Sequence, residues 1–104
     1  MLHDTKHDLS QDSQDLLNAA DYIDKYGWCQ RMTSSGKSVC LWGSLLAVTD
    51  GLGKSYGEAP RARELYDKVS THLGAFLAPW NDEPWRTKAE VTALLREVAL
   101  KSKE

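Results

Sequence analysis

Cysteine and histidine are the residue types in this sequence best suited to covalent chemistry. Cys29, His72 and either Asn81 or Asp82 follow one another in the order found in Cys-His-Asn enzymes. Such a site needs a thiolate, a base that generates it and a polar group that orients the base. Both Cys29 and Cys40, however, stand among tryptophan and leucine, where cysteine usually serves as a small apolar side chain. We therefore expect core roles for both, and a small cysteine-dependent enzyme ranks last among the candidate functions.

A pair of histidines near the N-terminus has a spacing that would place both rings on one face of a helix. His3 and His7 are four residues apart, with Asp4 and Asp8 beside them. This terminal segment lacks apolar support for a helix, and it lacks the glutamate of an HExxH motif. The two cysteines are not in CxxC spacing either. We expect no metal ion and no other cofactor.

Residues 51–55 (GLGKS) look like the end of a phosphate-binding P-loop. That loop requires a further glycine upstream, but Val48 and Thr49 occupy the relevant positions. The segment also follows a predicted helix rather than a strand. Nucleotide binding is therefore not expected.

Four tryptophans are many for a chain of 104 residues. They are Trp28, Trp42, Trp80 and Trp85, and a domain this small can hardly bury all of them. Tryptophan is prominent both in protein cores and in the centres of interfaces. Trp80 and Trp85 each follow a proline, which stiffens the segment and lowers the entropy lost on binding. We expect these two to be partly exposed and to contact a partner; the alternative is that they cover one end of a helical bundle.

Polar residues around these tryptophans add a second candidate feature. Asn81 and Asp82 can hydrogen-bond the backbone, and Arg86 can pair with Asp82. The simplest interpretation is a structural clasp that sets the angle of the last helix, and the alternative is a small polar site. The candidate binding residues are therefore Trp80, Asn81, Asp82, Trp85 and Arg86.

Hydrophobic periodicity predicts two helices in the first half of the chain. The first runs from about residue 10 or 12 to residue 26, and Gly27 ends it. The second is capped by Ser38 and extends to residue 49. Gly43 lies inside it at a cost of about 1 kcal/mol relative to alanine, which indicates close backbone packing against another element.

Two further helices are predicted in the second half. The third begins at Pro60, where proline suits the first turn, and its apolar stripe continues to residue 77. Pro79 ends it and opens a loop over residues 79–86. The last helix begins with a capping box formed by Thr87 and Glu90.

These elements predict a single, mainly α domain over residues 1–104, a compact bundle of about four helices. Residues 28–32 and 39–41 form either a small β-hairpin between the first two helices or an irregular loop. Residues 1–10 are expected to form a flexible arm, and residues 101–104 a solvated tail.

Composition narrows the class of partner. The net charge is −2 and the isoelectric point is near 5.9, whereas nucleic-acid-binding domains usually carry a basic surface. No apolar run approaches the roughly 20 residues that a membrane span needs. The N-terminus has no signal-peptide pattern. We expect a cytoplasmic protein that binds neither nucleic acid nor membranes.

Three motifs carry a resemblance to a known family. They are GWC at residues 27–29, CLWGSL at 40–45 and NDEPWRTKAEV at 81–91. In this order they resemble a family of small, uncharacterised proteins of actinobacteria and their phages. Trp85 departs from the pattern, which has a small residue there, and residues 54–59 match nothing in it. The resemblance implies a helical domain in a bacterial or phage setting, and it implies no activity.

Together these observations favour a non-enzymatic module that binds another protein. In the setting that the resemblance implies, it would be a phage or bacterial accessory protein acting on a host protein. The alternative is a self-associating structural domain, such as a homodimer.

Overall fold

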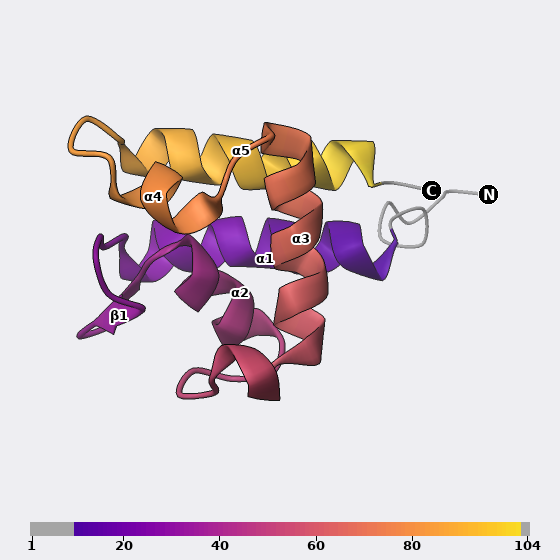
Figure 1. Cartoon of the computed structure of the whole chain (residues 1–104), viewed down its shortest axis with the longest axis horizontal. Helices are drawn as coiled ribbons and strands as arrows, with labels where there is room; N and C mark the ends of the chain where they lie inside the picture. Colours follow the sequence, from indigo (N-terminus) through magenta and orange to yellow (C-terminus); the bar gives the residue numbers. More distant parts are fainter. Residues whose placement is uncertain (1–9, 103–104) are drawn as a thin grey trace.

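The computed structural model describes residues 10–102, which form five α-helices, a short 3₁₀-helix and a two-stranded hairpin (Figure 1). The mainly helical class is confirmed, with one helix more than expected. Most of the predicted N-terminal arm, with its two histidines, lies outside these residues. In the described part no helix is long and apolar enough to cross a membrane. The elements are α1 (Gln11–Tyr26), β1 (Ser34–Ser35), β2 (Ser38–Val39), α2 (Leu41–Val48), η2 (Tyr56–Glu58), α3 (Pro60–Leu73), α4 (Leu77–Asp82) and α5 (Lys88–Lys101).

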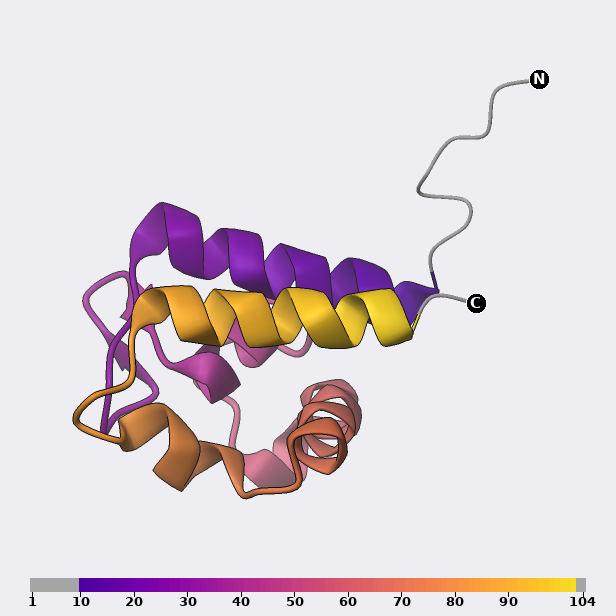
Figure 2. The same ribbon diagram turned by 90° about the horizontal axis from the view of Figure 1, so that it is seen from above.

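Helices α1 and α5 lie side by side and antiparallel along most of their length (Figures 1 and 2). Both contribute fully buried leucines to the core, among them Leu16 and Leu95. Ser13, also buried, donates a hydrogen bond to the carbonyl oxygen of Ala99 at 2.6 Å, so the apolar contact is also held in register. α2 packs against α1, α3 packs against α2 and α5, and α4 packs against α2 and α3, so that the helices share one core.

The ends of α1 follow the sequence prediction. Ser10 is its N-cap and accepts a hydrogen bond from the Ser13 amide, and Gly27, with φ of 103°, follows its last residue. The predicted C-terminal tail starts at a residue that belongs to the last helix. Lys101 is the last residue of α5, and the Ser102 carbonyl accepts a hydrogen bond from Ser10 Oγ at 2.7 Å.

A hairpin does form between α1 and α2, but with shorter strands than predicted. Ser34 pairs with Val39 and Ser35 with Ser38 in antiparallel register. Trp28, which the prediction placed in the first strand, instead forms an isolated parallel bridge with Val39. The hairpin is therefore confirmed, but its first strand is residues 34–35 rather than the predicted residues 28–32.

The start of α2 is also corrected. Ser38 belongs to β2, and its hydroxyl donates to the Tyr26 carbonyl, so it is not free to cap a helix. Cys40 is the N-cap, and its Sγ accepts from the Gly43 amide at 3.3 Å. The close packing expected at Gly43 is confirmed, because a Cβ there would lie 2.2 Å from the carbonyl oxygen of Thr33.

The segment after Leu73 differs most from prediction. The third helix ends at Leu73 because Gly74 adopts a left-handed conformation with φ of 76°. Residues 77–82, assigned partly to the third helix and partly to a loop, form the separate helix α4. Pro79 does not end a helix; it lies in the first turn of α4, where a missing amide hydrogen costs little.

Ion pairs tie α3 to α1. Arg61 pairs with Asp12 at 2.6 Å and with Asp15 at 2.8 Å, and Lys68 pairs with Asp12 at 2.6 Å. Burial by itself raises the pKa of Asp12, but the hydrogen bonds from Lys68 and Arg61 outweigh it. The pKa of Asp12 therefore lies below its ordinary value.

Candidate functional site

Asn81 is the structural centre of the predicted site. Its side chain is buried, with 3% exposed, and it uses both ends of the amide. Oδ1 accepts from the Trp28 indole at 2.8 Å and from the Leu41 amide at 3.1 Å. Nδ2 donates to the Cys29 carbonyl at 3.3 Å and to Asp82 Oδ1 at 2.9 Å. A fully bonded amide in this position joins three segments of chain and leaves no polar atom for a ligand.

Neighbouring hydrogen bonds extend this clasp along residues 28–31. The Gln30 side chain donates to the carbonyls of Asn81 and Glu83 at 3.0 and 2.8 Å. The Arg31 amide donates to Asp82 Oδ1 at 2.8 Å, and Arg31 has a positive φ of 68°. The clasp was expected to set the angle of the last helix, but it directly fixes α4 against the segment that follows α1.

Arg86 does not form the predicted pair with Asp82. Its Nε donates to the Trp80 carbonyl at 2.8 Å, and its guanidinium lies 3.9 Å from the centre of the Trp80 ring. Its ion pair within the described residues is with Glu90, at 3.4 Å. Glu90 also closes the predicted capping box with Thr87, which is confirmed. Arg86 therefore holds the turn between α4 and α5 and stacks on an aromatic ring.

α4 and the turns on either side of it carry three large aromatic side chains, Phe76, Trp80 and Trp85; together with Pro79 we call these residues the outer aromatic face. Phe76 is 79% exposed and Trp85 is 67% exposed. Trp80 is only half-buried and packs partly against the core, so Trp85 meets the expectation of exposure more fully than Trp80. A shallow hollow of about 230 Å³ lies in this region, lined by Ala75, Phe76, Pro79, Trp80, Glu83 and Arg86.

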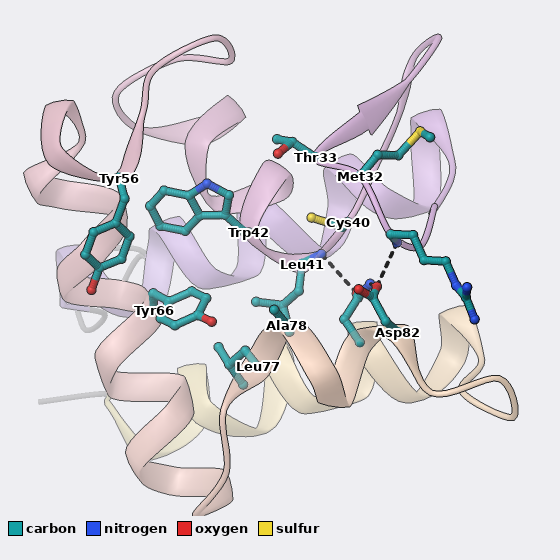
Figure 3. A pocket seen from close by; sticks show the side chains of 12 residues that line it. Met32, Thr33, Cys40, Leu41, Trp42, Tyr56, Tyr66, Leu77, Ala78 and Asp82 are labelled. Carbon is teal, nitrogen blue, oxygen red and sulfur yellow. Dashed lines mark hydrogen bonds between the residues drawn. The ribbon is translucent and has the colours of Figure 1, made fainter.

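The opposite side of α4 faces α2 across a cavity of about 330 Å³ (Figure 3). Leu77, Ala78, Asn81 and Asp82 supply its α4 wall. The five predicted site residues are therefore not one site, because Asn81 and Asp82 lie on this inner side and the others do not. The remaining lining residues come from elsewhere in the chain: Arg31, Met32, Thr33, Cys40, Leu41, Trp42, Tyr56 and Tyr66.

Sequence reasoning missed this cavity. Two of its aromatic side chains, Tyr56 and Tyr66, lie on η2 and α3 and pack edge-on against each other, with ring centres 6.3 Å apart. Tyr56 stands in the segment that matched no recognised pattern, and it is 51% exposed. The ring centres of Tyr56 and Trp42 lie 5.5 Å apart, but the distance between the two residues in the sequence could not predict this contact. The one usable signal was an aromatic residue in an otherwise polar, glycine-containing loop.

The cysteine and histidine candidates are not assembled into one site. Burial raises the pKa of Cys29 and of Cys40, so each thiol is less ionised than a free cysteine. His72 pairs with Glu97 between α3 and α5, while Asn81 is fully engaged in the clasp. Among residues 10–102 no group of three or more possible metal ligands comes together. The order of these residues along the chain therefore does not correspond to a shared location.

These features describe a small helical domain built around a buried amide clasp. Residues 8–101 match a family model described as a family of unknown function, DUF6197. The chain belongs to this family, which agrees with the resemblance to an uncharacterised family. No curated protein and no solved structure matches it.

Proposed function

We propose that this chain is a protein-binding module and that its contact surface is the outer aromatic face. The observation that carries the proposal is the exposure of two large aromatic side chains, Phe76 at 79% and Trp85 at 67%. Single exposed apolar residues are common, but exposed apolar patches mark sites of association, and Phe76 and Trp85 flank the same short helix, α4. Aromatic residues are also the most frequent energetic centres of protein interfaces.

The outer aromatic face is supported by ordered backbone. Gly74 ends α3 with the Ser70 carbonyl accepting from its amide, and Arg86 binds the Trp80 carbonyl and stacks on the Trp80 ring. A surface that is already ordered loses little conformational entropy when a partner binds. This favours binding that requires no refolding of the outer aromatic face.

The partner that fits this surface is a protein with an apolar groove and a polar rim, because Glu83 and Arg86 border the aromatic residues. The setting implied by the resemblance makes a bacterial host protein the first partner to test. We place the interaction in the cytoplasm, where two unpaired cysteines stay reduced.

The test is affinity capture from a bacterial lysate with the Phe76→Ser/Trp85→Ser double variant. Both side chains are exposed, so their replacement leaves the core intact. The matched control is Leu100→Ser, since Leu100 is 71% exposed on α5, outside this face. A protein retained by the wild type and by Leu100→Ser, but lost from the double variant, supports the proposal. Equal retention by all three contradicts it.

Self-association is the second candidate, because the same exposed aromatic residues could pack against a second copy. Light scattering distinguishes the two candidates. A mass near twice 11.7 kDa that returns to 11.7 kDa in the Phe76→Ser/Trp85→Ser variant supports a dimer through this face. A mass of 11.7 kDa for the wild type excludes it.

A further inference from the structure

The cavity between α2 and α4 is separate from the outer aromatic face, because the two lie on opposite sides of α4. Its volume of about 330 Å³ falls within the range of sites that hold small molecules. None of the exposed aromatic residues of the outer face contributes to its lining. An occupant of the cavity would therefore not be the partner proposed for that face.

Most of the cavity wall is aromatic or aliphatic. Trp42 packs edge-on against Tyr66, with ring centres 5.4 Å apart, and lies 5.5 Å from the Tyr56 ring. Leu77 and Ala78 of α4 face these rings across the cavity (Figure 3). The rings are in contact with one another and form one continuous wall. Such a wall favours the flat or branched apolar body of a ligand.

The other end of the cavity carries a carboxylate. Asp82 Oδ1 accepts hydrogen bonds from the Arg31 amide and from Asn81 Nδ2. Among the described residues, no donor is bonded to Asp82 Oδ2. The Arg31 side chain is exposed, and it forms no ion pair with Asp82. Asp82 as a residue is half-buried, and its Oδ2 is available to accept from a ligand beside an apolar cavity.

The negative charge of Asp82 acts on its surroundings. After burial, it is among the causes that raise the pKa of both Cys29 and Cys40. Its field therefore extends over this end of the cavity, where Cys40 is part of the lining. A cation that reaches Asp82 is favoured by its charge, and the Arg31 side chain in the same lining is exposed and forms no ion pair with Asp82.

We propose that this cavity binds an organic cation with an apolar body, of the aryl-alkyl amine class. The ammonium group donates to Asp82 Oδ2, and the apolar body lies against Trp42, Tyr56 and Tyr66. A neutral ligand of the same shape would leave the carboxylate oxygen without a charged partner.

Three probes of nearly equal shape test this assignment by heteronuclear NMR titration of the full chain. Tryptamine carries an ammonium group, tryptophol a hydroxyl and indole-3-propionate a carboxylate. Tryptamine is expected to shift the Trp42 indole and the Arg31 and Leu41 amide resonances saturably, with a dissociation constant of about 1 mM or lower. Tryptophol should bind about tenfold more weakly and indole-3-propionate not measurably. Equal binding of the three, or none by tryptamine, would overturn the proposal.

Two variants locate the binding. Asp82→Asn keeps an oxygen for the Arg31 amide but removes the charge, and it should weaken tryptamine about tenfold, to the level of tryptophol. The matched control Asp67→Asn removes an exposed carboxylate that is not part of the cavity lining, and it should leave binding unchanged. Ala78→Leu fills the cavity from an exposed position and should abolish binding in a protein with an otherwise unchanged spectrum. Unchanged tryptamine affinity in Ala78→Leu overturns the proposal, whatever the fate of Asp82→Asn.

Discussion

Replacing Asn81 by alanine tests the clasp that holds α4 in place. Asn81→Ala removes one acceptor shared by two donors, the Trp28 indole and the Leu41 amide. It also removes the donor to the Cys29 carbonyl. Asn81 is only 3% exposed, so water cannot readily take over the hydrogen bonds of its side-chain amide without a structural change.

The expected cost follows from the groups left without partners. Each buried donor without an acceptor costs about 1–3 kcal/mol, so the two together give a loss of about 2–6 kcal/mol in the free energy of unfolding. A domain of this size has a total stability of about 5–15 kcal/mol. The loss should lower the melting temperature by at least about 8 °C.

Urea unfolding followed by circular dichroism measures this loss. The matched control is Asn18→Ala, since Asn18 is exposed on α1 and alanine is the better helix former, so its effect should lie within about 0.5 kcal/mol. A double-mutant cycle with Trp28→Phe isolates the indole–amide hydrogen bond and should give coupling above about 0.5 kcal/mol. An Asn81→Ala loss below about 1 kcal/mol would refute the clasp.

Two further substitutions and one labelling experiment test other parts of the structure. Gly43→Ala should destabilise by about 1–3 kcal/mol because its Cβ meets a backbone oxygen, whereas Gly57→Ala, with open space around it, should be neutral or mildly stabilising in the same urea assay. Cys29 and Cys40 should react with iodoacetamide at neutral pH more slowly than a small-molecule thiol, because their pKa values are raised; rapid stoichiometric labelling would support the enzyme alternative. Asp12→Asn should cost about 0.5–1 kcal/mol of stability at neutral pH. The pKa of Asp12 is lowered in the folded state, so its carboxylate stabilises the fold at pH values above the pKa of the unfolded chain, and the cost should fade below about pH 4. An Asp12→Asn effect that is independent of pH would contradict this assignment.

The sequence predicted the helices whose ends carry strong local signals. Ser10 and Gly27 bound α1, Pro60 opens α3, and the capping box at Thr87 opens α5, all as expected. The error lay at Gly74, where a left-handed residue ends α3 although the apolar spacing continues through it. Periodicity reports which side chains are apolar, and it does not report a change of chain direction at one glycine.

The candidate site was predicted in part. Asn81 and Asp82 were identified as hydrogen-bonding residues, but their partners in residues 28–31 lie about fifty positions earlier in the chain. Such pairings depend on how the helices pack, so local patterns do not contain them. The cavity between α2 and α4 has the same origin, because its walls come from five separated segments.

Site-specific photocrosslinking tests the proposed binding surface most directly. Benzoylphenylalanine is placed at position 76, where the native phenylalanine is 79% exposed, and at position 100 as a control with 71% exposure. Irradiation in bacterial cells is predicted to give one discrete adduct from position 76, with a mass different from that of two copies of the chain. No adduct is expected from position 100. An adduct of twice 11.7 kDa would point to self-association. No adduct from position 76, or the same adducts from both positions, would contradict the outer aromatic face as a partner-binding surface.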